Sequence, residues 1–188
     1  MFAPRTGTNQ ASLQASLQAT LPGVVLGIDP GLTRCGYAVV QPGPQPSLLA
    51  LGVLTTPASH EVPERLGRLH ADLNALLDEF GPTAVAVERV FFQHNTRTAM
   101  SVGQASGVVL ALAASRGCRV VQYTPTQVKN AVAGFGAASK EEIQRMVQLR
   151  CGLRSLPTPA DAADAAALAL CHIATEPFAR SVAGAMAR

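Results

Sequence analysis

The chain has 188 residues, of which 48% are hydrophobic and 14% are charged, and its formal net charge is +3. This length suits one domain with a full hydrophobic core, and the composition excludes a disordered or fibrous chain. No apolar run reaches the roughly 18 residues that span a bilayer, and the N-terminus lacks the apolar core of a signal peptide, so we expect a cytoplasmic protein. The four cysteines include no CxxC pair, which argues against a zinc knuckle or a disulfide framework and favours buried or idle thiols.

The first part of the chain predicts three strands after a polar leader. Residues 1–22 are rich in Ala, Ser, Thr and Gln, and we assign this leader no site. Residues 24–29, VVLGID, form a short apolar run that a Pro-Gly pair stops, which is typical of a strand buried on both faces. Residues 35–40 and 48–54 predict the second and third strands.

The rest of the chain alternates helices and strands. Leucines at helical spacing predict an amphipathic helix over residues 62–80, and the apolar run TAVAVE predicts a strand that ends at Glu88. The later elements are a helix over residues 96–115, a strand over 119–123, a helix from Ser139 to about Leu149 and a last helix to about Thr175. This order belongs to an α/β domain with a mixed sheet.

Local signals mark where the last two helices begin. Ser139 and Glu142 form a capping box, while Thr158 suits the N-cap and Pro159 the first position of the last helix. The helix over residues 96–115 is apolar on most of its circumference, which predicts either a central core position or a contact shared with a partner subunit.

Only twelve residues are acidic, so each can be tested for an ordinary role. Eight lie where solvated acids are common, on or beside the first helix, at a helix N-terminus, or beyond the last helix. These eight are Glu61, Glu64, Asp72, Asp78, Glu79, Glu141, Glu142 and Glu176. The four that remain are Asp29, Glu88, Asp161 and Asp164.

The four remaining acids suit a metal site. Asp29 and Glu88 each end a short apolar strand, where a buried carboxylate needs a compensating cation or hydrogen bonds, and strand ends are where open α/β sheets bind ligands. Asp161 and Asp164 are three residues apart at a helix start and so share one face. If that helix docks over the strand ends, the four carboxylates suit Mg²⁺ or Mn²⁺. Two such ions about 4 Å apart can activate a water and stabilise the leaving oxygen in phosphodiester cleavage.

Each acid also has an ordinary alternative role. Asp29 before Pro-Gly suits a turn, and Glu88 has Arg89 or Arg119 as a candidate partner. Asp161 suits the acidic half of a TxxD capping box, and Asp164 suits a second-turn helix acid. The quartet indicates a metal site more strongly than any one of its members.

Basic residues are concentrated in the middle of the chain. From Gly81 to Lys140 there are six basic residues and a single acid, so this stretch is a candidate surface for phosphates. The six are Arg89, Arg97, Arg116, Arg119, Lys129 and Lys140. The two lysines are the only ones in the chain, and each is equally well interpreted as a solvated surface cation.

The segments around the four acids match one family. GIDPGLTRCGYAVV resembles the first strand and hairpin of the RuvC family of junction-cutting endonucleases, AVERVFFQHN its second acidic segment, and ADAADAAALAL its acidic C-terminal helix. QVKNAVAGFGAASKEEIQRMV resembles the segment between the last two, so the similarity runs in order over residues 24–175.

This resemblance implies an RNase H-like fold, with a mixed five-stranded sheet flanked by helices, over residues 23–178 and a C-terminal tail over residues 179–188. The implied ligands of two Mg²⁺ or Mn²⁺ ions per subunit are Asp29, Glu88, Asp161 and Asp164. The implied activity is symmetric paired nicking of four-way (Holliday) DNA junctions in recombination and repair. Its hydrolysis leaves 5′-phosphate and 3′-hydroxyl ends.

The resemblance also implies contacts with DNA. Lys129 and Lys140 match lysines beside the cleaved strand, where they would neutralise phosphate charge. Phe91 matches an aromatic residue that stacks on an unpaired base, although its neighbour Phe92 is the alternative. The further candidates for backbone phosphates are Arg34, Arg89 and Arg97.

The implied partners are a second copy of the chain and two other proteins. The helix that contains Gly103, Gln104 and Gly107 matches the two-fold contact of the family, so we expect a homodimer whose two sites cut opposed strands. RuvA and RuvB, the branch-migration proteins, are the other implied partners. His172 follows Asp164 by eight residues, and we interpret it as a polar helix residue.

Two competing interpretations remain. Sugar kinases and actin-like ATPases also open with an acidic strand and a glycine-rich hairpin, but they need a duplicated domain, and this chain has no internal repeat of that kind. The second alternative is a non-catalytic junction-binding protein, or a nuclease of the same fold with another substrate.

Overall fold

The computed structural model describes the backbone of residues 23–90 and 96–186, and the side chains of residues 23–90 and 99–176. The elements are β1 (Val25–Asp29), β2 (Arg34–Gln41), β3 (Ser47–Thr55), α2 (Val62–Phe80), β4 (Ala84–Glu88), α3 (Thr96–Ser115), β5 (Arg119–Tyr123), α4 (Pro125–Ala133), α5 (Lys140–Arg150) and α6 (Ala160–Met186). No helix in this described part combines the length and apolar character needed to cross a bilayer.

The strands form one mixed sheet in the order β3-β2-β1-β4-β5. β1, β2 and β3 are antiparallel neighbours, whereas β4 and β5 run parallel to β1. This arrangement confirms the predicted five-stranded mixed sheet. Parallel neighbours end at the same edge, and Ile28 pairs with Val87, so the following residues, Asp29 and Glu88, come out side by side.

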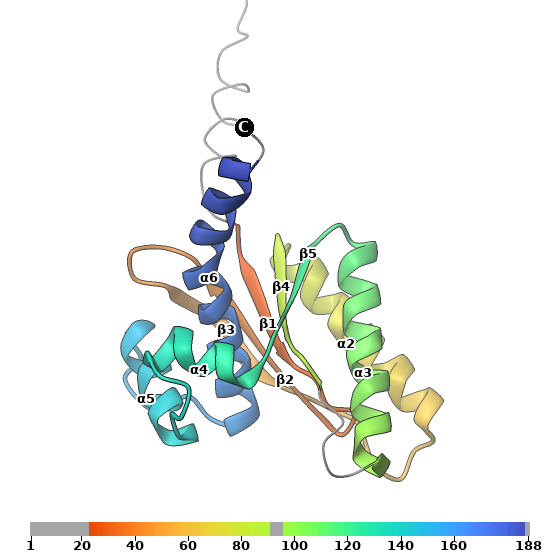
Figure 1. Cartoon of the computed structure of the whole chain (residues 1–188). Coiled ribbons are helices and arrows are strands. Elements are labelled where there is room, and N and C mark those ends of the chain that lie inside the picture. The colour runs from red at the N-terminus through yellow and green to blue at the C-terminus, as the bar shows by residue number, and fades with distance from the viewer. Residues whose placement is uncertain (1–22, 91–95, 187–188) are drawn as a thin grey trace, which may run out of the picture.

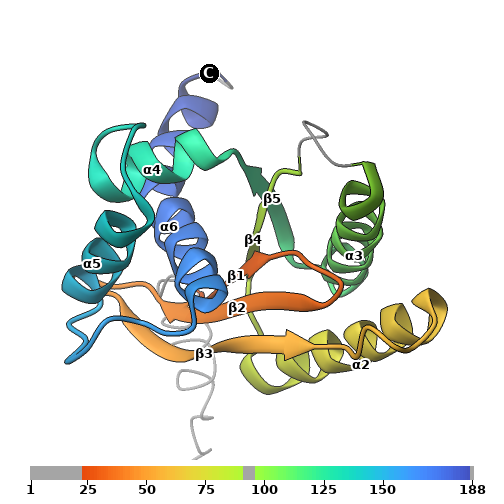
Figure 2. The same cartoon turned by 90° about the horizontal axis from the view of Figure 1, so that it is seen from below.

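Helices cover both faces of the sheet, as Figures 1 and 2 show. α2 and α3 lie on one face, where they bury Leu26 and Ile28 of β1. α4, α5 and α6 lie on the other face, where Val25 of the same strand is buried. Burial on both faces explains why β1 is a continuous apolar run in the sequence.

Two capping boxes begin the helices that cover the second face. At α5 the Ser139 hydroxyl accepts from the Glu142 amide at 3.2 Å, and the Glu142 carboxylate accepts from the Ser139 amide at 2.7 Å, which confirms the predicted box. α4 was missing from the predicted elements. Thr124 and Gln127 form the same reciprocal pair there, a signal that the sequence analysis did not use.

The start of α6 corrects the prediction. The helix begins at Ala160, and the Pro159 carbonyl accepts hydrogen bonds from the backbone amides of Ala162 and Ala163. Pro159 therefore precedes the first turn and does not open it, so Thr158 is not the N-cap.

The end of α6 also differs from the prediction. The helix continues past Thr175 to Met186. Inside it the Thr175 hydroxyl donates to the Cys171 carbonyl at 2.9 Å, so this residue is accommodated within the helix and does not end it. Glu176 consequently lies within α6 and pairs with Arg119, whereas the sequence analysis placed it beyond the helix as a solvated acid.

The four cysteines are free thiols. Burial raises the pKa of Cys35 to about 12 and that of Cys171 to about 11. These two thiols are therefore protonated and unreactive at neutral pH, in agreement with their interpretation as idle core residues.

Candidate functional site

The C-terminal ends of β1 and β4 place two carboxyl groups in contact. A side-chain hydrogen bond joins Asp29 to Glu88, and both residues are largely buried. Burial first, and then the charge of Glu88, raise the pKa of Asp29 from 3.8 to about 8. Asp29 therefore keeps its proton at neutral pH unless a cation replaces it.

The first turns of α6 add the other two acids. An Asp161 carboxylate oxygen accepts from Arg34 Nε at 2.6 Å, and an Asp164 oxygen accepts from Lys140 Nζ at 3.1 Å. The negative charges of both aspartates contribute to raising the pKa of Asp29. The four acids that the sequence analysis selected thus meet at one end of the sheet.

A cavity of about 180 Å³ opens between the strand ends and the helices of the second face. Its polar lining residues are Asp29, Glu88, Lys129, Lys140 and Asp164. Apolar side chains of α4, α5 and α6 complete the wall. Asp161 is not among the lining residues, because its carboxylate faces Arg34. The cavity therefore combines carboxylates with the only two lysines of the chain.

Lys140 is electrostatically part of this cluster. Its hydrogen bond and ion pair with Asp164, followed by the charges of Asp29 and Asp161, raise the pKa of Lys140 above its usual value. Lys129 lines the cavity from α4 and makes no ion pair with the described residues. A phosphate that enters the cavity would meet both cations.

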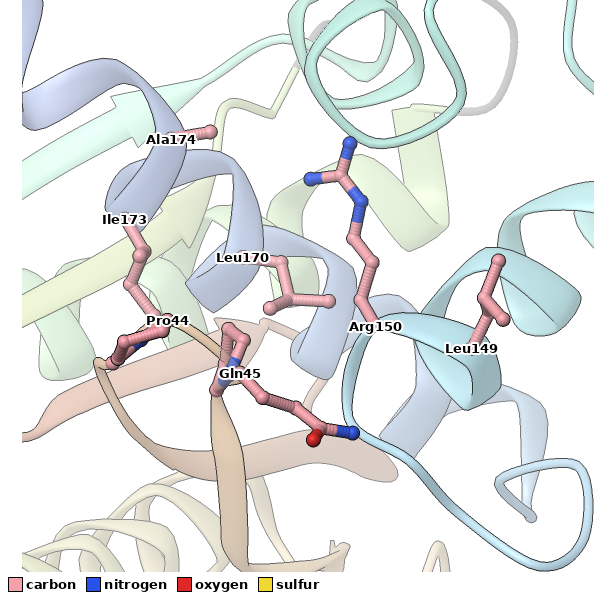
Figure 3. Close-up of a pocket in the computed structure, with 9 residues that line it drawn as sticks. Pro44, Gln45, Leu149, Arg150, Leu170, Ile173 and Ala174 are labelled. Carbon is pink, nitrogen blue, oxygen red and sulfur yellow. The ribbon is translucent and has the colours of Figure 1, made fainter.

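Two larger hollows lie elsewhere and contain different chemistry. One, of about 430 Å³, lies between the β2–β3 turn, the end of α5 and α6; Figure 3 shows it, lined by Pro44, Gln45, Leu170 and Ile173. Its charged residue, Arg150, donates to the Ala131 carbonyl at 3.1 Å. The other, of about 610 Å³, contains the ion pair of Arg119 and Glu176. Neither hollow brings two acids together. The functional site is therefore identified by the chemistry of the smaller cavity at the strand ends and not by cavity volume.

For Glu88 and Asp161 the structure shows partners other than those of their ordinary alternative roles, whereas Asp164 does lie in the second turn of α6. Glu88 contacts Asp29, whereas Arg119 pairs with Glu176. Asp161 bonds Arg34 and does not complete a capping box. Arg116 pairs with Asp78 and Lys140 with Asp164, so three members of the basic middle stretch, with Arg119, are engaged in ion pairs within the fold.

Other candidate residues lie outside the cavity or outside the described part of the chain. Arg89 follows Glu88 with an exposed side chain, while its backbone amide donates to the Tyr123 carbonyl. Phe91 and Phe92 lie outside the described residues, as does the side chain of Arg97.

His172 belongs to a separate buried network. Its Nδ1 lies 2.8 Å from the Tyr123 hydroxyl, and its side chain lies near Glu176. Eight residues of helix separate it from Asp164, a rise of about 12 Å. It is a polar helix residue, as the sequence suggested, with a structural role in the core.

Arg65 is a supporting residue that the sequence analysis did not identify. Its Nε donates to the Thr56 hydroxyl at 2.9 Å, and its Nη2 donates to the Thr33 hydroxyl at 2.7 Å. Thr33 directly precedes Arg34, so α2 is fastened to the hairpin that carries the partner of Asp161. These contacts join distant segments, and no local spacing in the sequence reveals them.

The chemistry of the cluster fits a divalent cation, although its side chains are not in ligating positions. Among the described residues, no group of three or more His, Cys, Asp or Glu side chains is arranged to hold a metal ion. Instead the proton of Asp29, the Arg34 guanidinium and the Lys140 ammonium each neutralise part of the acidic cluster. The carboxylates of the four acids are hard oxygen donors, which Mg²⁺ and Mn²⁺ prefer as ligands.

Comparison with known proteins identifies the family. The model of the crossover junction endodeoxyribonuclease RuvC family matches residues 25–172. The RuvC of Thermomicrobium roseum is 51% identical over 148 residues, which are 79% of this chain and 91% of that protein. The RuvC of Syntrophomonas wolfei is 47% identical over 150 residues, 79% of this chain and 87% of that protein.

Solved structures agree with this match. Thermus thermophilus RuvC in complex with a Holliday junction substrate superposes with a TM-score of 0.80 at 43% identity, covering 84% of this chain and 96% of that chain. The yeast mitochondrial Holliday junction resolvase Ydc2, at 15% identity, shares the fold with a TM-score of 0.65 over 95% of this chain and 90% of its own. The fold is RNase H-like, as the resemblance implied. The chain belongs to the RuvC family of crossover junction endodeoxyribonucleases.

Proposed function

We propose that this protein resolves four-way DNA junctions by metal-dependent hydrolysis of two opposed phosphodiester bonds, in recombination and DNA repair. The observation that carries the proposal is the cavity at the strand ends, where acids from β1, β4 and α6 meet two lysines. Membership of the RuvC family supports the same activity. The products are 5′-phosphate and 3′-hydroxyl ends, which a ligase can seal.

Four carboxylates would hold the metal, namely Asp29, Glu88, Asp161 and Asp164. Mg²⁺ or Mn²⁺, two ions per subunit, would supply activation of the attacking water and stabilisation of the leaving oxygen. Ligation requires Asp29 to lose its proton. A metal ion would also compete with Arg34 for Asp161 and with Lys140 for Asp164.

The basic residues of the site would bind the scissile strand. Lys129 and Lys140 line the cavity and would neutralise the phosphate that is cut. Arg34, once released from Asp161, lies at the same end of the sheet and would hold a neighbouring phosphate. Arg89 is exposed beside Glu88 and suits the same task.

Further DNA contacts and the division of the chain are also proposals. Arg97 would join the phosphate contacts, and Phe91 would stack on an unpaired base near the junction centre. We place the catalytic domain in residues 23–178, with a leader over 1–22 and a tail over 179–188, into which α6 continues as far as Met186. The family model, which matches residues 25–172, supports this division.

The active form would be a homodimer in contact through α3. This helix buries Ala105, Val109 and Leu112 on one side, while Met100 and Gly107 are exposed on the other. An apolar helix with one free side suits a two-fold contact, and two identical sites suit a junction with near two-fold symmetry. RuvA and RuvB are the proposed partners that would deliver the junction.

Cleavage of a synthetic four-way junction, with linear duplex and an EDTA control, tests the proposal. We expect paired, symmetric nicks confined to the junction with Mg²⁺ or Mn²⁺. Asp29→Asn should abolish cutting and keep junction binding, whereas Asp72→Asn, at an acid on α2 paired loosely with Arg68 at 3.9 Å, should cut normally.

Either of two results would contradict the proposal. Retained cutting by Asp29→Asn would exclude the metal-site assignment. Tight junction binding without cutting by the unaltered protein, with either metal, would make this a junction-binding protein instead.

A further inference from the structure

α6 lies on the sheet at an unusually short distance where it crosses two glycines. A Cβ added to Gly36 of β2 would lie 2.1 Å from the Asp161 carbonyl oxygen and 2.6 Å from its carbonyl carbon. A Cβ added to Gly27 of β1 would lie 2.0 Å from the Ala165 carbonyl oxygen. Real Cβ atoms essentially never approach other atoms closer than 3.0 Å, and these neighbours are helix backbone, which cannot rotate away.

The two glycines face the part of α6 that carries the acids. The facing residues of the helix include Ala162, Ala165, Ala166 and Ala169, all fully buried against the sheet. Small residues on both sides therefore let the helix backbone rest directly on the strand backbone. Any larger residue at either glycine requires α6 to move outward by about 1 Å. This is the difference between the distance from the added Cβ to the helix carbonyl oxygen, 2.0 to 2.1 Å, and the 3.0 Å limit.

Gly36 occupies a special place among these contacts. It is the ladder partner of Asp29 across the β1–β2 pair, and it also touches the backbone of Asp161. One residue without a side chain thus lies between the backbones of two acids that come from distant parts of the chain. Its size sets the separation of those two backbones.

We propose that Gly36, with Gly27 as a second point of contact, is a positioning residue that sets the depth of the α6 acids over the Asp29–Glu88 pair. This inference rests on the proposed function, because it gives the α6 acids a task at the metal site. A misplacement of about 1 Å in a catalytic arrangement can lower the rate by about 100-fold. Gly36→Ala, which replaces one hydrogen atom by a methyl group, should therefore reduce mainly the rate of cutting and the affinity for metal.

The first test compares Gly36→Ala with Gly67→Ala. Gly67 lies on α2, where an added Cβ meets nothing within 4 Å, so its substitution is a matched control. For Gly36→Ala we expect the rate constant for cutting a synthetic junction to fall by about 100-fold. Junction affinity in EDTA should change less than about threefold, since the DNA-binding surface is retained.

Mn²⁺ binding separates positioning from general damage to the fold. Titration of the protein with Mn²⁺, followed by electron paramagnetic resonance of the free ion, should show weaker binding in Gly36→Ala and unchanged binding in Gly67→Ala. Circular dichroism should show that both variants are folded at the temperature of the assay. Wild-type Mn²⁺ affinity and wild-type cutting by Gly36→Ala would overturn the inference.

A change in the length of the Asp161 side chain tests the distance between the α6 acid and the Asp29–Glu88 pair without adding an atom between helix and sheet. Asp161→Glu adds one methylene while the distance between helix and sheet is unchanged. The longer side chain should carry the carboxylate past its position at the metal site and lower the rate of cutting by at least about tenfold. In the Gly36→Ala background the longer side chain should recover part of the lost rate. Should Gly36→Ala not fold, full activity of Asp161→Glu would still overturn the inference.

Asp161→Asn distinguishes a failure of this inference from a failure of the proposed function. If Asp161→Asn cuts normally, the α6 acid is not part of the metal site and the proposed function is wrong there. If Asp161→Asn is inactive while Gly36→Ala cuts normally, the site stands and the positioning role of Gly36 is wrong.

Discussion

Three acids of the cluster are neutralised by different groups. Asp29, hydrogen-bonded to Glu88, keeps its own proton because its pKa is raised, Asp161 accepts from Arg34, and Asp164 accepts from Lys140. Carboxylates this close together at the end of a buried strand are stable only with such compensation. A divalent cation must displace these compensating groups. In the metal-free protein they should make the free energy of unfolding depend on pH.

Asp29→Asn should stabilise the metal-free protein, increasingly so as the pH rises. The folded-state pKa of Asp29 is raised to about 8 from 3.8, so the folded chain keeps a proton that the unfolded chain has released between these values. Stability contributed by this proton is complete below pH 4 and is lost as the pH rises through 8. Asparagine titrates nowhere in this window.

Urea unfolding in EDTA at pH 5, 7 and 9 measures this effect. At pH 9 the variant should be more stable than the wild type by about 1 to 3 kcal/mol. Asp72→Asn serves as the control and should show no trend of this size. A stability difference that does not change with pH would contradict the assignment of the shifted proton to Asp29.

Arg65→Lys should destabilise the hairpin beside the site. The guanidinium group bonds the hydroxyls of Thr33 and Thr56 at once, a geometry that an ammonium group on a flexible chain does not reproduce. We expect a loss of about 1 kcal/mol in the free energy of unfolding. Arg68→Lys, at an exposed pair 3.9 Å apart, should change stability by less than about 0.5 kcal/mol in the same urea titration. Equal effects of the two variants would count against the role of Arg65.

At the scale of elements, two short helices present the lysines of the cavity. α4 carries Lys129 and α5 begins with Lys140, and a complete capping box opens each helix. Helices of nine and eleven residues are marginal by themselves. Their caps and their packing on α6 therefore hold both cations at the wall of the cavity.

Ser139→Ala removes one of these caps. Loss of the hydrogen bond from the Glu142 amide should lower the free energy of unfolding by about 1 kcal/mol. Because Lys140 is the next residue, junction cutting should also fall, whereas Ser155→Ala, at an exposed serine, should change neither quantity. Thermal unfolding and the junction assay measure the two effects. Unaltered stability of Ser139→Ala would show that the box contributes nothing to α5.

At the scale of the whole molecule, the active edge and the exposed side of α3 are separate surfaces. The acids meet at the strand ends, beside the start of α6. Figures 1 and 2 show α3 together with α2 on the face of the sheet opposite α6. Paired nicks need two active sites, so cutting at the active edge depends on α3 only if two chains associate through that helix. A change on α3 should therefore act on the symmetry of cutting.

Gly107→Arg tests this connection. A Cβ added at Gly107 meets nothing within 4 Å of its own chain, so the substitution leaves the isolated subunit undisturbed. Sedimentation should show a monomer, and paired nicks on a junction should be lost. Gly67→Arg, at an equally open position on α2, should remain dimeric and active. A dimeric, fully active Gly107→Arg variant would exclude this side of α3 as the contact.

Local sequence patterns were sufficient for most elements and for the choice of the four acids. The apolar runs of β1 and β4, the leucine spacing of α2 and the capping box of α5 each depend on residues close together in the chain. The acids were found by elimination, because an acid at the end of a buried strand has few ordinary roles. The ends of α6 were predicted wrongly, since Pro159 and Thr175 are compatible with more than one position in or beside a helix.

By itself, the sequence determined the order of the elements other than α4, the mixed sheet and the identity of the acidic quartet, because these depend on period, apolar pattern and local chemistry. Only the tertiary structure decided how the acids are paired, since Arg34, Lys140 and Glu88 reach their partners across long stretches of chain. It also decided the separation of β2 and α6 at Gly36, where the missing side chain matters only because a helix more than one hundred residues later rests on it. Contacts of that kind have no local signature, because they arise when the whole chain packs.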